Sequence, residues 1–180
     1  PMDAFAAFQP FLAQVETTLL EQLGGAQPPP GDTLVQAARH LCLKAGKRAR
    51  PMLVKIFGDT LGVAEARLVE PAVAAELVHA ASLLHDDVVD NGMFRRGKPT
   101  VNARWGNTVA VMSGDLLLSG ALLRLSRFDP RVAEAALAVV AEMTRAAIDE
   151  VQARGNLDLT LEGLKAIGEG KTGSLFGFCG

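Results

Sequence analysis

The sequence predicts an all-α fold, and three observations support this. Alanine-rich and leucine-rich runs recur along the 180 residues, of which 49% are hydrophobic and 21% charged. Apolar residues return at steps of three and four, the spacing of amphipathic helices. No segment has a convincing strand pattern, because the flanks of valine-rich pieces such as TVAVM (108–112) continue a helical period. This composition and length indicate one globular domain covering residues 1–180.

The first predicted helix covers residues 3–23. Its apolar side chains lie at helical spacing: Phe5, Phe8, Leu12, Val15, Leu19 and Leu23. Glycine and proline in residues 24–32 end it, and a second helix is predicted at 32–45. In the charged turn that follows, AGKRARP, Pro51 suits the first position of the next helix because its missing N–H costs nothing there.

Five more helices are predicted beyond this turn. They cover residues 52–61, 66–91, 107–127, 130–154 and 160–178. Turn-forming residues separate them, at Gly62, at GKPT (97–100), at Asp129-Pro130 and at GNLDLT (155–160).

Charge and cysteine content exclude several classes of protein. The net charge is −2 and the basic residues form short clusters beside acidic ones, so we expect no nucleic-acid partner. Cys42 and Cys179 have no metal-ligand spacing, and two thiols without a signal peptide favour the reducing cytoplasm. We expect no apolar stretch of the roughly 18 residues that a membrane span needs.

An acidic cluster lies on the longest predicted apolar helix. Asp86 and Asp90 are four residues apart, where like charges repel, so they require a compensating cation. A solvated polar face is the alternative, but a helix that is apolar nearly all round is usually buried, and buried carboxylates must be paired, protonated or metal-bound. We predict Mg²⁺, whose octahedral shell suits carboxylates, waters and phosphate oxygens. Asp87 lies about 100° around the helix from Asp86 and is expected to support the site rather than bind the metal.

Basic residues accompany this cluster on both sides. Arg95 and Arg96 follow it closely, and arginine holds phosphate oxygens through paired hydrogen bonds. Lys47 and Arg50 precede a predicted helix N-terminus, where free N–H groups and the helix dipole favour an anion. The combination of acidic and basic groups predicts a metal-bridged diphosphate substrate.

Two weaker signals complete this set. His79 lies one heptad before Asp86, which makes it a candidate hydrogen-bond donor to diphosphate, although a core histidine is the commoner reading. Lys171 and Thr172 lie near a predicted helix break at Gly170.

These residues resemble the trans-prenyltransferase family, also called polyprenyl or isoprenyl diphosphate synthases. The resemblance rests on blocks that occur in order: GKRARP at 46–51, HAASLLHDDVVD at 79–90, RRGKPT at 95–100, GNTVAVMSGDLLL at 106–118 and GKTGSLF at 170–176. It covers nearly the whole chain. It implies antiparallel helices around a deep central cavity, commonly in a homodimer.

The resemblance also implies a reaction. An allylic diphosphate would ionise with the help of Mg²⁺, and the double bond of isopentenyl diphosphate would attack the carbocation. A proton would then leave, with the released pyrophosphate as its acceptor. No protein nucleophile is required, which accounts for the absence of a recognisable triad.

Site residues follow from the matching blocks. The residues implied in catalysis are Asp86, Asp87, Asp90, Arg95 and Lys171, with Asp86 and Asp90 as direct Mg²⁺ ligands. Isopentenyl diphosphate would contact Lys47, Arg50, His79 and Arg96. The allylic diphosphate would be held by Arg95, Lys171 and Thr172. Ala81 and Ser82 would floor the elongation pocket, and because both are small we expect a medium or long product.

One part of the family pattern has no counterpart. The family's second aspartate-rich motif is not found before Gly180, and Asp149-Glu150 lacks its spacing. We therefore expect one incomplete domain that lacks the C-terminal helices and turns over weakly as an isolated chain.

Other functions compete with prenyl transfer. A non-catalytic subunit of a heteromeric synthase is the main alternative. A metal phosphohydrolase of the HD type would use the LLHDD pair, with His40 and Asp115 as further ligands. A class I terpene cyclase would share the aspartate motif but would not require the isopentenyl site at Lys47, Arg50 and Arg96.

Overall fold

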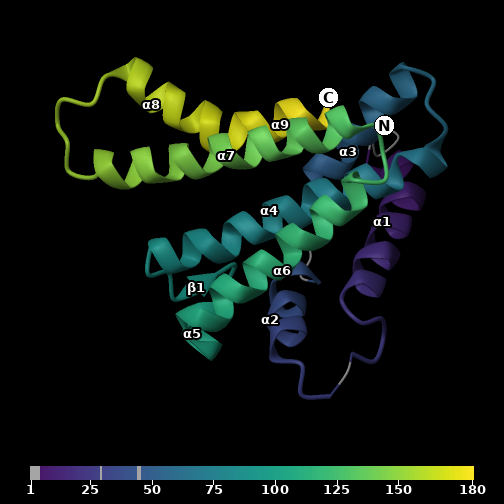
Figure 1. Cartoon of the computed structure of the whole chain (residues 1–180), viewed down its shortest axis with the longest axis horizontal. Coiled ribbons are helices and arrows are strands. Elements are labelled where there is room, and N and C mark those ends of the chain that lie inside the picture. The colour runs from purple at the N-terminus through teal and green to yellow at the C-terminus, as the bar shows by residue number, and fades with distance from the viewer. Residues whose placement is uncertain (1–4, 29, 44–45) are drawn as a thin grey trace.

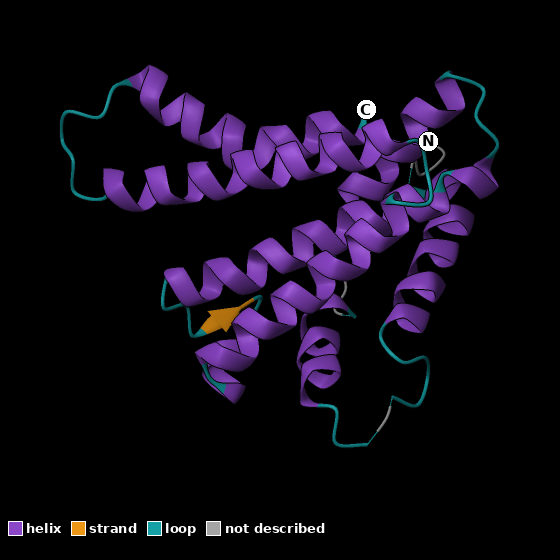
Figure 2. Cartoon of the chain, in the orientation of Figure 1, coloured by secondary structure: helices purple, strands orange, loops and turns teal. Residues whose placement is uncertain are grey.

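The computed structural model describes residues 5–28, 30–43 and 46–180, and the regular structure in these ranges is almost entirely helical (Figure 2). This confirms the predicted all-α class. In chain order the helices are η1 (Ala6–Phe8), α1 (Gln9–Gln22), α2 (Thr33–Cys42), α3 (Ala49–Thr60), η2 (Glu65–Arg67), α4 (Val69–Val89), α5 (Val101–Trp105), α6 (Asn107–Leu125), α7 (Pro130–Ala153), α8 (Leu161–Gly168), the π-helix η3 (Glu169–Gly173) and α9 (Ser174–Cys179). Residues 3–4 and 44–45, at the ends of two predicted helices, lie outside the described residues.

Side-chain caps explain where several helices begin. In each case an oxygen accepts a hydrogen bond from a backbone N–H of the first turn, which would otherwise have no partner in the helix. The capping residues are Asp32 for α2, Thr100 for α5, Asp129 for α7 and Thr160 for α8. The predicted breaks at GKPT, Asp129-Pro130 and GNLDLT each contain one of these capping residues.

Two predicted boundaries are wrong. α3 begins at Ala49, so Pro51 is its third residue and Arg50 lies within the first turn rather than before it. Gly170 does not break a helix, because η3 carries α8 directly into α9. A Cβ on Gly170 would lie 2.8 Å from Cβ of Ala146, so the glycine allows η3 to approach α7 closely.

A small hairpin between α4 and α5 was not predicted. Strands β1 (Phe94–Arg95) and β2 (Lys98–Pro99) pair antiparallel. Arg96 and Gly97 form the turn with φ of 51° and 72°, and positive φ at both positions is typical of a two-residue hairpin. Two residues per strand are too few to produce a recognisable alternation in the sequence.

Figure 1 shows α4 and α6 crossing at the centre, with the antiparallel pair of α7 and α8–α9 on one side and α1 and α2 on the other. α4 packs most extensively on α6. On α1, Val15 and Leu19 are buried as predicted, and Phe11 also enters the core, whereas Phe5, which precedes η1, is 55% exposed. Each fully buried leucine or phenylalanine contributes about 1.5–3 kcal/mol, so this core holds α4 in place.

By length and composition alone, α6 could cross a membrane, with a mean hydropathy of 1.4 in its most apolar window. This corrects the expectation that no apolar stretch reaches that length. α6 is also the main partner of α4, as expected of a core helix.

Candidate active site

The two carboxylates predicted to bind metal lie one turn apart near the end of α4. Their side chains are 19% exposed at Asp86 and 45% exposed at Asp90. Lys171 of η3 places its Nζ 3.5 Å from Oδ1 of Asp86, and Arg154, just after α7, forms an ion pair with Asp90. Cations from the α7–α9 layer therefore offset the repulsion between the two carboxylates.

The local charges shift the titration of this cluster. Burial raises the pKa of Asp86 above its ordinary value and Asp90 adds to the rise, while Lys171 opposes it. Burial alone would lower the pKa of Lys171, but hydrogen bonding to Glu150 and the charge of Asp86 leave that pKa raised. Lys171 is therefore a stable cation between Glu150 and Asp86. Sequence reasoning missed both Glu150 and Arg154 as members of this cluster.

These carboxylates fit Mg²⁺ by their chemistry. Asp86 and Asp90 present hard oxygen donors on one face of a helix, and Mg²⁺ usually takes one or two carboxylates together with waters and phosphate oxygens. In the described part of the chain no group of three or more His, Cys, Asp or Glu residues is arranged to hold a metal. A cation bound by these two carboxylates would complete its shell with waters or with phosphate oxygens.

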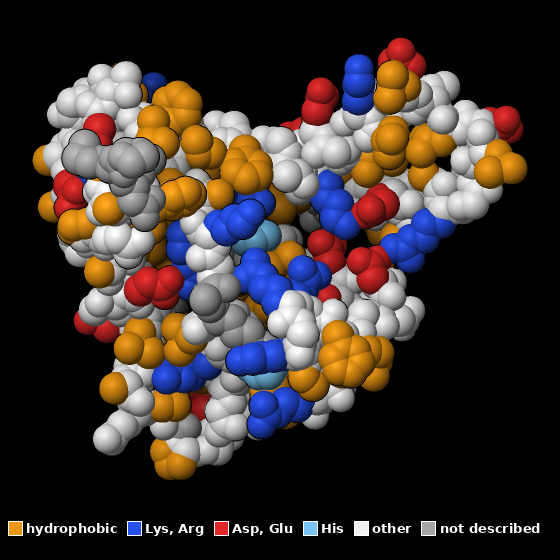
Figure 3. All heavy atoms as spheres, turned by 180° about the vertical axis from the view of Figure 1, so that it is seen from behind, with side chains coloured by type: hydrophobic (Ala, Val, Ile, Leu, Met, Phe, Trp, Pro, Cys, Tyr) orange, Lys and Arg blue, Asp and Glu red, His pale blue; other side chains and the backbone are white. Residues whose placement is uncertain are grey.

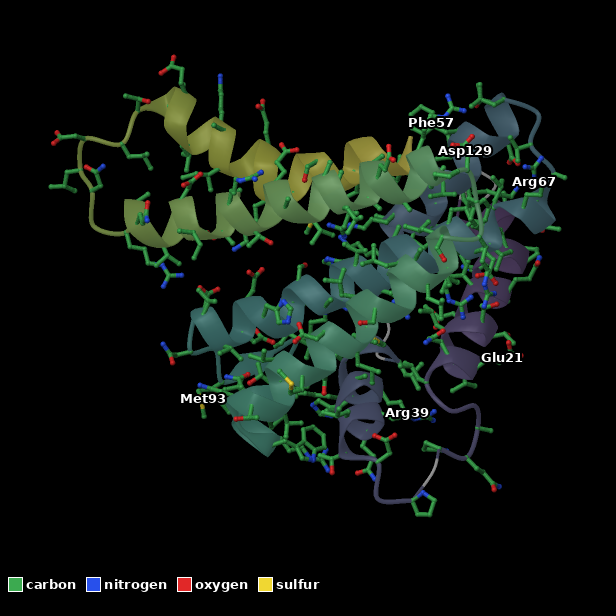
Figure 4. All side chains as sticks on the ribbon, in the orientation of Figure 1. Glu21, Arg39, Phe57, Arg67, Met93 and Asp129 are labelled. Atoms are coloured by element: carbon green, nitrogen blue, oxygen red, sulfur yellow. The ribbon has the colours of Figure 1, made fainter. Side chains whose placement is uncertain are left out.

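Asp87 lies on a different side of α4 and is 5% exposed. Nε of Arg95 donates to both of its carboxylate oxygens at 3.1 Å, and Nη2 donates to Oδ1 at 2.8 Å. Asn102 binds the backbone oxygens of Asp87 and Gly92. Asp87 thus fixes Arg95 and the hairpin to the end of α4. Met93, the residue directly before β1, is labelled in Figure 4.

The hairpin carries Arg96 back to the loop before α3. A Cβ on Gly46 would lie 3.2 Å from Nη1 of Arg96, so the guanidinium lies against this glycine. Arg96 and Arg48 both adopt left-handed backbone conformations, with φ of 51° and 47°. Such conformations are uncommon for residues other than glycine and cluster at functional sites.

Six basic side chains converge on a cavity of about 470 Å³ beside α4. They are Lys47, Arg48, Arg50, His79, Arg95 and Arg96. Figure 3 shows Lys, Arg and His side chains gathered on this face, with acidic side chains next to them. The structure therefore brings together the residues that the sequence assigned to isopentenyl diphosphate.

His79 is neutral in this basic environment. Burial lowers its pKa to about 3, and the positive charges of Arg50, Arg96, Arg95 and Arg48 act in the same direction. A neutral imidazole can still donate one hydrogen bond to an anion.

Arg50 is available to a ligand. It is 9% exposed, burial lowers its pKa, and its guanidinium carbon lies 4.6 Å from the ring centroid of Phe176. Its Nε is buried and has no hydrogen-bond partner among the described residues. Buried polar groups are rarely left unsatisfied, so this donor indicates a place for an anion.

Arg48 was not singled out from the sequence. It donates to both carboxylate oxygens of Glu16, at 2.6 and 3.1 Å, to Glu76 at 2.8 Å and to the backbone oxygen of Cys42. The signal available was a third cation in GKRARP together with a glutamate, Glu76, three residues before His79 on the apolar helix α4. Arg48 neutralises the carboxylate nearest the basic cavity.

A second cavity, of about 340 Å³, is lined by Asp86, by Lys171 and by apolar side chains of α4, α6 and α7. Ala81 and Ser82, which the family resemblance assigns to the floor of an elongation pocket, both line it. Thr172 is exposed and lines neither cavity.

The ligand set of a phosphohydrolase is not assembled. Nε2 of His85 does lie 3.3 Å from Oδ1 of Asp115, but Nε2 of His40 lies 2.8 Å from the backbone oxygen of Pro99. No metal-binding group of three such residues forms in the described ranges.

The structure thus combines an all-α fold with a basic cavity and a largely apolar cavity that are both lined by residues of α4. The polyprenyl synthetase family profile matches residues 32–179, and the chain belongs to this family.

Relatives and solved structures agree with this family. The nonaprenyl diphosphate synthase of Mycobacterium tuberculosis is 34% identical over 177 residues, which are 97% of this chain and 51% of the relative. Heptaprenyl diphosphate synthase component 2 of Geobacillus stearothermophilus is 34% identical over 156 residues, 86% of this chain and 49% of the relative. The geranylgeranyl pyrophosphate synthetase structure from Pyrococcus horikoshii has a TM-score of 0.90 at 32% identity and covers 97% of this chain and 54% of that chain. The chain spans about half the length of these relatives.

Proposed function

We propose that the protein condenses isopentenyl diphosphate with an allylic diphosphate to form a longer polyprenyl diphosphate. The observation that carries this proposal is the arrangement of two cavities along α4. One is lined by basic side chains, and the other by Asp86, Lys171 and mostly apolar side chains. A diphosphate carrying an apolar chain needs both environments.

The chain's residues have separate tasks in this proposal. Lys47, Arg50, His79 and Arg96 bind the diphosphate of isopentenyl diphosphate and orient its double bond. Asp86 and Asp90 hold Mg²⁺, which stabilises the negative charge on the departing diphosphate. Lys171 adds a positive charge at the mouth of the apolar cavity, and the small Ala81 and Ser82 leave room for a medium or long product.

We further propose a homodimer in the cytoplasm. Met112, Leu116 and Leu123 are 45%, 38% and 62% exposed and follow one face of α6 at helical spacing. A second copy could cover this stripe by two-fold self-association. The buried free thiols of Cys42 and Cys179 are compatible with a reducing compartment. Assembly with a different subunit is the alternative, since one relative is by name a component of heptaprenyl diphosphate synthase.

The decisive experiment measures chain elongation. The purified protein is incubated with labelled isopentenyl diphosphate and an allylic primer, with Mg²⁺ or with a chelator, and the lipids are separated by chromatography. Mg²⁺-dependent labelled lipid supports the proposal.

A parallel binding titration distinguishes a protein that binds isopentenyl diphosphate without turnover from one that has a different function. The protein should bind isopentenyl diphosphate, and Arg50→Gln should weaken that binding about tenfold. The matched control is Arg145→Gln, an exposed arginine on α7. Absence of both elongation and binding would exclude prenyl transfer.

A further inference from the structure

A further cavity lies between α2 and α5, outside the candidate active site. Its volume is about 360 Å³. The lining residues are Gln36, Arg39, His40, Leu43, Arg104 and Trp105. α2 therefore borders two cavities, because Leu41 and Cys42 line the basic cavity beside α4.

The charge at this cavity is uncompensated. Within residues 5–28, 30–43 and 46–180, neither Arg39 nor Arg104 forms an ion pair with a carboxylate, and no Asp or Glu lines the cavity. Nη1 of Arg39 donates to the backbone oxygens of Leu23 and Gly25, at 2.9 and 2.6 Å. These bonds fix the guanidinium without neutralising it. Figure 4 shows Arg39 extending from α2.

Aromatic contacts order the other side of the cavity. The guanidinium carbon of Arg104 lies 4.4 Å from the ring centroid of Trp105. This stacking uses the face of the guanidinium and leaves its N–H groups, which lie in the plane, available to an anion. His40 meets Trp105 edge to face at a centroid distance of 5.2 Å, and its Nε2 donates to the backbone oxygen of Pro99.

We propose that this cavity binds a small phosphate-bearing anion at a site separate from the active site. Two arginines offer several N–H donors, which match the oxygens of a phosphate better than a single acceptor atom. The volume lies within the roughly 300–1,000 Å³ typical of small-molecule sites. Because both arginines and the indole are already held by neighbouring groups, little side-chain ordering is needed on binding.

The protein contains its own reporter for this site. Trp105 is the only tryptophan and there is no tyrosine, so the intrinsic emission excited at long wavelength arises in this cavity. Inorganic pyrophosphate should produce a saturable change in that emission. Arg104→Gln should weaken binding about tenfold, the effect of losing one charge-assisted hydrogen bond. Isothermal titration calorimetry confirms the affinity of this variant, since removing Arg104 also changes the unbound emission.

Two controls locate the site. Arg127→Gln, at an exposed arginine after α6, removes the same charge elsewhere and should leave the affinity unchanged. Arg50→Gln disturbs the basic cavity beside α4 and should leave the Trp105 response unchanged. Loss of the response in Arg50→Gln, an equal effect of Arg104→Gln and Arg127→Gln, or no saturable response would each overturn the proposal.

Vesicles identify the source of the phosphate. Phosphatidylcholine vesicles with and without phosphatidic acid are added, and the Trp105 emission is followed with pyrophosphate as competitor. If the Trp105 emission changes only with vesicles that contain phosphatidic acid, and pyrophosphate reverses the change, the ligand is a lipid headgroup. A response to pyrophosphate alone assigns a soluble phosphate compound. An equal response to both vesicle types would indicate apolar adsorption and contradict the phosphate site.

Discussion

Arg95, which the family resemblance assigns to the allylic diphosphate, binds both carboxylate oxygens of Asp87. The pair joins the end of α4 to the hairpin that carries Arg96. One aspartate of the motif therefore positions arginines, while Asp86 lines the apolar cavity and Asp90 pairs with Arg154.

Replacing Asp87 should test this division of roles. Asp87→Asn breaks a pair in which the carboxylate side chain is 7% exposed, and we expect the free energy of unfolding to fall by about 3 kcal/mol. Urea denaturation measures the change. The matched variant Asp149→Asn alters an exposed aspartate on α7 and should change stability by less than about 0.5 kcal/mol. Equal effects of both variants would contradict the structural role of Asp87.

Arg48 should be required for the stability of the folded protein because it neutralises the charge of Glu76. The side chains are 10% and 8% exposed, so Arg48→Met leaves a buried carboxylate without its partner and should cost about 3 kcal/mol. Adding Glu76→Gln should recover part of this loss, since a neutral amide is cheaper to bury. A double-mutant cycle by urea denaturation measures the coupling. Additive losses of stability in the two single variants would show that Arg48 and Glu76 do not interact. Arg67→Met, which removes an exposed arginine, is the control and should leave stability nearly unchanged.

His79 should make the protein less stable in mild acid. Its pKa is about 3 in the folded protein and 6.5 in the unfolded chain, so the unfolded chain binds more protons between these values and stability rises with pH across that window. Between pH 7 and pH 5 the histidine should cost about 2 kcal/mol. His79→Gln should remove this part of the pH dependence in urea titrations. If stability depended on pH in His79→Gln as it does in the wild type, or if His85→Gln lost the same pH dependence, the dependence could not be assigned to His79.

The cavity beside Ala81 should limit the length of the prenyl chain. Ala81→Phe fills part of the apolar space, so the affinity for farnesyl diphosphate should fall more than that for geranyl diphosphate, by about tenfold, the scale of a few methylene contacts. Calorimetric titration of both ligands measures this ratio without requiring turnover. Ala103→Phe, at an exposed position of α5, provides a size-matched control. An unchanged ratio would disprove the role of this cavity.

The stripe on α6 should mediate self-association. Leu123→Lys places a charge at a 62% exposed position of this stripe and should shift the protein towards monomer by at least tenfold in dissociation constant. Sedimentation velocity measures the assembly. Leu61→Lys, at a 74% exposed position after α3, should have no effect. A monomeric wild-type protein would exclude the proposed dimer.

The sequence predicted the longer helices well, because their periodicity and turn residues are local signals, but it missed the five-residue α5. It failed at the hairpin, whose strands are too short for a pattern, and at Gly170, where close packing on α7 favours a π-helix over a break. It also missed Arg48, Glu150 and Arg154, since the partners of a charged side chain depend on which helices meet.

The sequence by itself determined the all-α class, the polyprenyl synthetase family and the residue types of the site, because these follow from periodicity and from motifs of adjacent residues. Only the tertiary structure decided that Asp87 binds Arg95, that Lys171 lies between Glu150 and Asp86, and that Arg96 reaches Gly46. These relationships join residues far apart in the chain or on different sides of one helix. They are fixed by helix packing and by pairing of buried charge, which no local pattern specifies.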